Sequence, residues 1–431
     1  MKKIKKLLSL DLVKVSSTTF ISTIVKFISN FISAKVIAVY VGPAGIAIFG
    51  QLTNAAAIFL MLASGAINTG ITKYLAQHSN EPNVQKKYIS NAFLITLYAS
   101  IFVTIIILLF AKTISFYLFN NDSYLVVTYL LAASIIFSAF NNLFLSIING
   151  FKQYKKFVKI SIFSSFFMVL LTIILVKKWE VTGALTAYIA SQSLIIFISY
   201  YFIKKEDWID FNFWKAKLDK KILKNLSKYT LMTLISASVL PICLITIRKI
   251  LIHYNSIIDA GIWEGLNRIS MTYLTLITSS LQVYYLPRLS ELQSKDLIKK
   301  EIFQAYKLII PFLLFMCFSI FFLRNQIIII LFSNEFLPMS NLFLFQLVGD
   351  FFKIASFLIA FLMWAKGMIK IFILTEILFS GFYIAASYFG LKYWGLDGVV
   401  KAYALNYFLY FIFFIVYFKK ILIASKPNNL V

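Results

Sequence analysis

Apolar runs of about 20 residues recur from one end of this chain to the other, and they restrict its fold more than any other feature. A helix of about 20 residues crosses the hydrocarbon core of a bilayer, whereas a transmembrane strand needs only about ten residues of alternating polarity. Over 431 residues, 60% are hydrophobic and only 14% are charged. The sequence therefore predicts an all-α polytopic membrane protein.

The pattern predicts twelve transmembrane helices, six on each side of the longest polar segment. The first six are expected at 15–40, 44–74, 88–110, 124–149, 157–176 and 182–203, and the next six at 227–252, 256–286, 301–323, 340–365, 368–391 and 399–418. We interpret 1–203 as an N-terminal six-helix lobe, 204–226 as a cytoplasmic amphipathic linker, and 227–431 as a C-terminal six-helix lobe. Because six is even, both lobes enter the membrane in the same sense. This predicts a pseudo-two-fold axis along the membrane normal.

Basic residues are distributed very unequally between the two sets of connections. The N-terminus, every second connection and the C-terminus together carry 30 of the 42 Lys and Arg residues. Positively charged connections stay on the cytoplasmic side, so both termini are expected in the cytoplasm. The formal net charge of +25 then reflects orientation and attraction to anionic membrane lipids, and it does not indicate nucleic-acid binding.

Ionisable side chains within the predicted spans are the strongest functional signal. Each costs about 2.5–3.5 kcal/mol at a helix centre, and it is tolerated mainly where it faces a protein interior or water. The bases outnumber the acids, which predicts a cationic central cavity for an anionic cargo. The six bases are Lys26, Lys35, Arg248, Lys249, Arg268 and Lys353, and the three acids are Glu264, Asp350 and Glu376. Further polar lining of the cavity is expected from Gln51, Asn54, Asn267, Thr275 and Gln282. Lys73 and Arg288 lie at the cytoplasmic ends of their spans, where they would be the first to receive the headgroup of the cargo.

The same charges have plainer interpretations, which the sequence leaves open. Glu264 with Arg268, and Asp350 with Lys353, have the spacing of intrahelical ion pairs. Three other bases could extend their side chains from the apolar region to the outer membrane interface: Lys35, Arg248 and Lys249. The three acids are also candidates for coupling transport to a proton or sodium gradient.

Residues that would carry catalysis or bind a metal are not brought together in the sequence. His78 and His253 stand alone near span ends, and Cys243 and Cys317 lie within apolar spans. We also find no nucleophile and base arrangement, no acidic metal motif and no large extramembrane domain. The sequence therefore predicts no catalytic residues, no metal and no cofactor. A drug exporter is a rival interpretation, but its cavity would be expected to be lined by acids.

Several ordered motifs along nearly the whole chain resemble one known family. They are Gly42-Pro43-Ala44-Gly45-Ile46, Asn68-Thr69-Gly70-Ile71-Thr72-Lys73-Tyr74, Leu240-Pro241 with Arg248-Lys249, Ala260-Gly261-Ile262-Trp263, Tyr285-Leu286-Pro287-Arg288-Leu289, and Gln346-Leu347-Val348-Gly349-Asp350. The chain resembles the Wzx-type flippases, which include O-antigen translocases and lipid III flippases, in the multidrug/oligosaccharidyl-lipid/polysaccharide exporter superfamily.

The resemblance implies a specific activity. An undecaprenyl-pyrophosphate-linked oligosaccharide, such as an O-antigen repeat unit, would cross from the cytoplasmic to the periplasmic leaflet of the bacterial inner membrane by alternating access. The alternatives are the lipid III of enterobacterial common antigen as cargo, or cation-coupled drug export within the same superfamily. The implied partners are the lipid-linked glycan, membrane lipids, and the polysaccharide polymerase and chain-length regulator of the same pathway.

Overall fold

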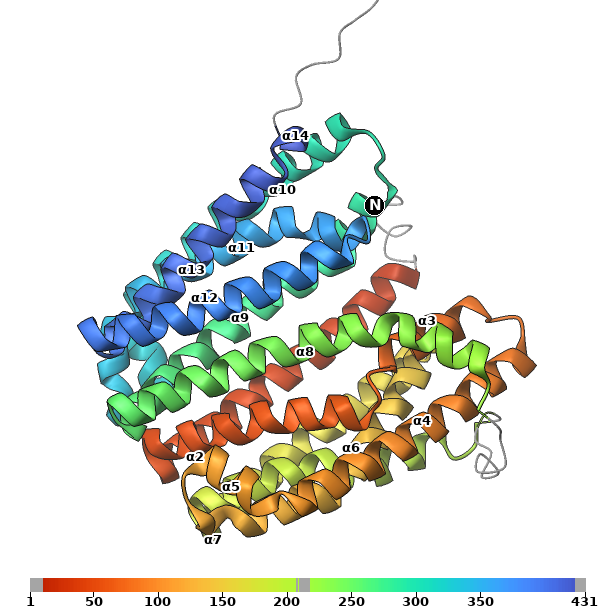
Figure 1. The fold of residues 1–431 in the computed structure, drawn as a ribbon, viewed down its shortest axis with the longest axis horizontal. Coiled ribbons are helices and arrows are strands. Elements are labelled where there is room, and N and C mark those ends of the chain that lie inside the picture. The colour runs from red at the N-terminus through yellow and green to blue at the C-terminus, as the bar shows by residue number, and fades with distance from the viewer. Residues whose placement is uncertain (1–10, 207, 209–217, 423–431) are drawn as a thin grey trace, which may run out of the picture. The chain divides into compact units, whose positions relative to one another are not determined.

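A computed structural model describes residues 11–206, 208 and 218–422, which form helices and short connections without a strand in these ranges (Figure 1). This confirms the predicted all-α class. The elements in chain order are α2 (Asp11–Ala63), α3 (Asn68–Gln77), α4 (Pro82–Leu109), α5 (Ala111–Phe119), η1 (Asp122–Tyr124), α6 (Leu125–Gly150), α7 (Tyr154–Ile203), α8 (Lys220–Tyr254), α9 (Ile257–Glu291), α10 (Lys295–Leu331), η3 (Asn334–Leu342), α11 (Phe343–Ala365), α12 (Ile369–Trp394), α13 (Leu396–Tyr417) and α14 (Lys419–Leu422).

The chain divides into two compact units. Unit 1 contains residues 1–41 and 48–241, and unit 2 contains residues 42–47 and 242–431. The division falls inside α8, next to Pro241, whereas the sequence suggested a linker at 204–226. Much of that segment lies outside the described residues, so the division into two lobes at this linker stays a prediction.

Two long helices are interrupted where the sequence predicted breaks between spans. In α2, Gly42 has φ 65° and ψ −169° and is followed by Pro43, so the helix is kinked at this point. In α7, Trp179 and Glu180 leave the helical region, with Glu180 at φ 47°. The helix α7 therefore contains two of the predicted spans, and α2 contains the first span and most of the second.

The predicted span 44–74 is wrong in one respect, because two helices occupy it. The helix α2 ends at Ala63, and α3 begins at Asn68. Between them Gly65 and Ala66 have φ values of 64° and 52°, a left-handed conformation that no α-helix continues through. The hydroxyl of Ser64 also donates to the carbonyl of Met61 at 2.8 Å.

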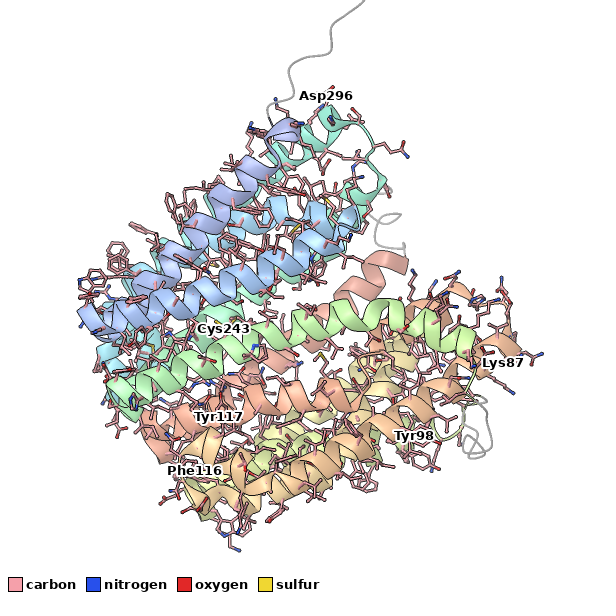
Figure 2. All side chains as sticks on the ribbon, viewed as in Figure 1. Lys87, Tyr98, Phe116, Tyr117, Cys243 and Asp296 are labelled. Atoms are coloured by element: carbon pink, nitrogen blue, oxygen red, sulfur yellow. The ribbon has the colours of Figure 1, made fainter. Side chains whose placement is uncertain are left out.

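Nine of the described helices are long and apolar enough to cross a membrane. The helix α9 is not one of them; it contains Glu264, Asn267 and Arg268, and several Ser, Thr and Tyr residues follow. Large apolar or aromatic side chains remain exposed, for example Tyr98, Phe116 and Tyr117 (Figure 2). Such exposure fits a surface in contact with lipid. The protein is thus multi-pass, and the number of twelve crossings stays a prediction.

The core of unit 1 extends into the connection after α7. Trp208 is buried and stacks on Phe151, with ring centroids 6.0 Å apart. Glu206 accepts hydrogen bonds from Gln153 at 2.7 Å and from Lys156. Burial raises the pKa of the Glu206 carboxyl, but the bonds from Lys156 and Gln153 outweigh that effect and lower the pKa. The structure therefore places Trp208, which lies in the segment expected to be an amphipathic linker, in the core of unit 1.

Unit 2 contains a close backbone contact that provides a stability test. A Cβ atom on Gly261 of α9 would lie 1.8 Å from the carbonyl oxygen of Pro43. The change Gly261→Ala must push two backbones apart, and we expect a loss of about 3 kcal/mol in stability. Gly381 of α12 is the matched control, because a Cβ there meets no atom within 4 Å. Thermal unfolding of the two purified variants checks this: equal midpoints would contradict the contact.

Candidate functional site

Two arginines and one glutamate form an ion-pair network between α8 and α9. Arg248 of α8 is fully buried, and its Nη2 donates to Oε2 of Glu264 on α9. Arg268, one turn further along α9, donates from Nε to Glu264 Oε1 at 2.9 Å. The guanidinium of Arg248 also lies 5.7 Å from the centre of the Trp263 ring, within range of a cation–π interaction. One carboxylate thus faces two guanidinium groups, which leaves the network with a net positive charge.

A second buried group surrounds Asp350 on α11. Ser270 donates to its two carboxylate oxygens at 2.6 and 2.8 Å, and Tyr273 of the same helix, α9, also donates to it. Tyr403 of α13 donates at 2.7 Å, and Gln346 adds a weaker contact at 3.5 Å. Asp350 is fully buried, so these donors replace its water shell and join three helices.

Lys353 lies one turn after Asp350 and is enclosed by aromatic rings. Its Nζ is 4.8 Å from the ring centre of Tyr407 and 5.7 Å from that of Tyr403. The acids whose charges act on it are Asp350 and Glu376 of α12. Lys353 is 6% exposed, so it is a buried cation without a direct ion-pair partner in the described part of the chain.

Of the two intrahelical ion pairs that the sequence allowed, the structure contains one. Glu264 and Arg268 are in contact, but Glu264 is shared with Arg248 of the preceding helix. Asp350 and Lys353 make no direct ion pair, and the oxygens of Asp350 instead accept hydrogen bonds from hydroxyl groups. Arg248, for which an interfacial position was one alternative, lies inside unit 2.

The remaining predicted site residues are spread over both units. In unit 2, Lys249 is half-buried, Asn267 is buried, Thr275 and Gln282 are exposed on α9, and Arg288 contacts Glu291 and Glu301. In unit 1, Lys26 is exposed, Lys35 and Asn54 are half-buried, Gln51 is buried, and Lys73 lies at the rim of a pocket. The single cavity lined by all of these residues stays a prediction.

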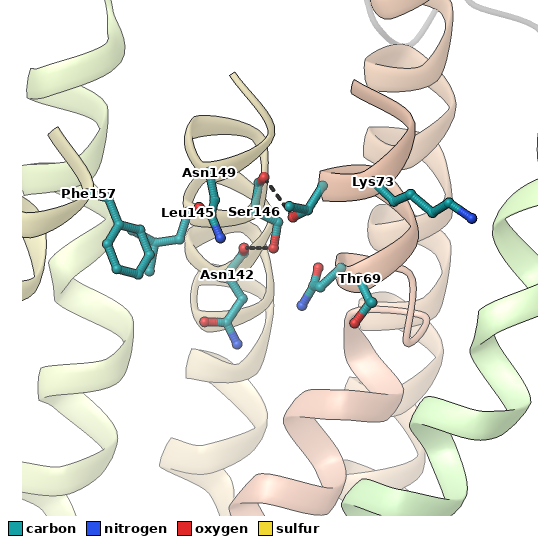
Figure 3. Close-up of a pocket in the computed structure, with 9 residues that line it drawn as sticks. Thr69, Lys73, Asn142, Leu145, Ser146, Asn149 and Phe157 are labelled. Atoms are coloured by element: carbon teal, nitrogen blue, oxygen red, sulfur yellow. Dashed lines mark hydrogen bonds between the residues drawn. The ribbon is translucent and has the colours of Figure 1, made fainter. Parts of the chain in front are cut away.

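That pocket in unit 1 was not anticipated from the sequence. It has a volume of about 640 Å³ and lies between α3, α6 and the start of α7 (Figure 3). A sequence signal existed, because Asn142, Ser146 and Asn149 recur at offsets of four and seven within a mostly apolar helix. The lining residues are Asn68, Thr69, Thr72, Lys73, Asn142, Leu145, Ser146, Asn149 and Phe157.

The described residues contain no group of three or more His, Cys, Asp or Glu side chains placed to hold a metal ion. Cys243 and Cys317 are both free thiols. The buried polar side chains of unit 2 are charged groups, hydroxyl groups and the amides of Asn267, Gln346 and Asn406.

A solved transporter structure shares the fold of this chain. An inward-facing multidrug resistance MATE family transporter of the MOP superfamily aligns with a TM-score of 0.76 at 16% identity. The alignment covers 93% of this chain and 96% of that one. The fold is thus that of the two-lobe membrane transporters of this superfamily.

Sequence relatives identify the family. The model of a family described as polysaccharide biosynthesis protein matches residues 12–293. Proteins called Lipid III flippase from Escherichia coli (strain K12) and Shigella flexneri are each 31% identical over 402 residues, covering 93% of this chain and 97% of theirs. The chain belongs to this polysaccharide biosynthesis family and, within it, to the Wzx-type flippases that its motifs resemble. It is a transporter and not an enzyme.

Proposed function

We propose that this protein moves an undecaprenyl-pyrophosphate-linked oligosaccharide from the cytoplasmic to the periplasmic leaflet of the bacterial inner membrane, with both termini in the cytoplasm. The observation that carries the proposal is the network of Arg248, Glu264 and Arg268, and Lys353 on α11 is a further buried base of the same unit. Within this network two guanidinium groups share one carboxylate, and that excess of positive charge favours an anionic cargo. The membership of the Wzx-type family supports the lipid-linked class.

Arg268 is the member of the network best suited to meet the cargo. Its side chain is 26% exposed, whereas that of Arg248 is completely buried. A pyrophosphate offers several oxygens to a guanidinium, which can bind two of them at once. In this proposal Arg248 fixes Glu264, and Glu264 in turn orients Arg268. An inside-negative membrane potential favours outward movement of an anion, by about 2.3 kcal/mol per charge per 100 mV.

Two glycans are candidate cargoes. The O-antigen repeat unit is the cargo that the sequence resemblance suggested first. Lipid III is the second candidate, and the two curated relatives called Lipid III flippase favour it. With either cargo, the polymerase and chain-length regulator of the pathway are proposed partners that receive the flipped unit.

Coupling to an ion gradient is proposed to involve Glu376. Glu264 is held by two arginines, and Asp350 accepts from three hydroxyl groups. Among the described residues Glu376 makes no hydrogen bond or ion pair, and its charge acts on Lys353. Transport in proteoliposomes at varied pH and varied sodium concentration tests this role: a rate independent of both would remove it.

Complementation tests the function. The gene is expressed in one strain that lacks its O-antigen flippase and in another that lacks its lipid III flippase, and long-chain polysaccharide is scored on gels. Rescue of only one strain assigns the cargo and shows that the glycan is recognised. Rescue of both shows that the lipid pyrophosphate is the main determinant. Failure in both strains, with the protein verified in the membrane, contradicts the proposal for these two cargoes.

The role of Arg268 is tested in the strain that is rescued. We expect Arg268→Glu to abolish polymer display at a normal protein level, because it places a second carboxylate beside Glu264. The matched control is Lys392→Glu, which reverses an exposed charge near the end of α12. Normal display by Arg268→Glu would contradict binding of the cargo at this network.

A further inference from the structure

The pocket of unit 1 is built mainly of neutral hydrogen-bonding groups. Three asparagines, two threonines and one serine contribute to a lining that contains a single charged residue, Lys73. In Figure 3 the Lys73 side chain extends away from Asn142 and Asn149. A metal or organic cation would require acids, and a phosphate would be expected to meet several bases. The lining therefore fits a neutral, polyhydroxylated ligand.

Close packing holds the walls of this pocket in place. Thr72 of α3 donates to the carbonyl of Ser146 on α6 at 3.0 Å, one of the contacts drawn in Figure 3. A Cβ on Gly150 would lie 2.9 Å from Cβ of Leu75 and 3.2 Å from the carbonyl of Thr72. Only a glycine permits this approach of α6 to α3. The polar groups are thus presented by two helices fixed against each other, as binding sites require.

Several side chains of the pocket have hydrogen-bonding capacity to spare. Oδ1 of Asn68 is buried and has no hydrogen-bond partner. The side-chain amides of Asn142 and Asn149 make no hydrogen bond to any residue within the described ranges. Each amide offers two donors and an oxygen acceptor, which matches both sugar hydroxyls and acetamido groups. Phe157 adds an apolar ring, against which the C–H face of a sugar can pack.

We propose that this pocket binds one or two sugar residues of the lipid-linked glycan, through the amides of Asn68, Asn142 and Asn149 and the ring of Phe157. The inference rests on the proposed function and adds where the glycan is recognised. The volume of the pocket, about 640 Å³, lies within the range of about 300–1,000 Å³ that is usual for small-ligand sites. In the predicted orientation, the C-terminal ends of α3 and α6 face the cytoplasm, where the cargo is made.

Binding of two short-chain probes by the purified full-length protein tests the proposal. One probe is decyl pyrophosphate, and the other is decyl pyrophosphate that carries a single N-acetylhexosamine. We expect the wild-type protein to bind the sugar-bearing probe more tightly. The double variant Asn142→Ala with Asn149→Ala should lose about tenfold in affinity for that probe, since two hydrogen bonds are removed, and should bind decyl pyrophosphate as before.

Two controls separate the outcomes. Asn80→Ala, an exposed asparagine between α3 and α4, should leave both affinities unchanged. Free N-acetylhexosamine should compete weakly, and equal binding of free and lipid-linked sugar would overturn the lipid-linked assignment. No preference for the sugar in the wild-type protein, or unchanged preference in the double variant, would overturn the pocket while leaving the proposed function intact. Binding of neither probe would overturn both.

Discussion

The change Glu264→Leu is expected to lower stability by about 3–5 kcal/mol, the largest effect of any single substitution in the ion-pair network. It would leave Arg248 fully buried without its carboxylate, and Arg268 close to the same site. An uncompensated charge in the interior is costly because no water can replace the lost partner. Detergent-solubilised protein should show a correspondingly lower unfolding temperature and a low yield.

The network also predicts an asymmetry between its members. Arg248→Met should cost clearly less than Glu264→Leu, because Glu264 keeps the contact with Arg268 at 2.9 Å. The double change Arg248→Met with Glu264→Leu should recover much of the stability, since an apolar pair can replace a buried ion pair. The thermal midpoints of the three proteins measure this. A double variant less stable than Glu264→Leu alone would refute the pairing.

The change Asp350→Leu is expected to cost about 4 kcal/mol, because it leaves the buried hydroxyl groups of Ser270, Tyr273 and Tyr403 without their acceptor. The change also removes the acid that lies one turn before Lys353 on the same helix. Asp350→Asn keeps one oxygen acceptor and should cost about half as much.

A graded series checks this account of Asp350. Tyr403→Phe removes only one donor and should lower stability by about 1 kcal/mol, so the losses should rise from Tyr403→Phe to Asp350→Asn to Asp350→Leu. Unfolding midpoints measured at one detergent concentration give the order. If Asp350→Leu unfolded at the same temperature as the wild-type protein, the hydroxyl contacts would be without energetic value.

Much of the fold could be predicted because a membrane restricts the chain to helices. The breaks at Gly42 and near Glu180 were visible as short polar or glycine–proline interruptions between long apolar runs. The break at Gly65 and Ala66 was missed, because Ala66 is an ordinary helix former and only the packing of α3 on α6 reveals the turn. Local sequence carries little information on such tertiary contacts.

For the candidate site, the sequence identified the charged residues but not their partners. Spacing indicated that Glu264 and Arg268 could pair, and they do. Spacing could not show that Arg248 shares Glu264, or that Asp350 is bound by hydroxyl groups from α9 and α13, because those contacts join different helices. The pocket on α3 and α6 was missed for another reason: apart from Lys73 its residues carry no charge, and asparagines in a mostly apolar helix attract little notice.

The ion pair between α8 and α9 also bears on how the chain enters the bilayer. The helix α9 is not apolar enough to qualify as a span, whereas α8 contains one, at Thr233–Tyr254. Arg248 and Glu264 are only 16 residues apart in sequence and lie on the two arms of one hairpin. If α8 entered alone, Arg248 would pass into the hydrocarbon without Glu264, whereas entry together with α9 gives this guanidinium its carboxylate. Insertion of α8 and α9 as a pair, during synthesis, is the route that this arrangement favours.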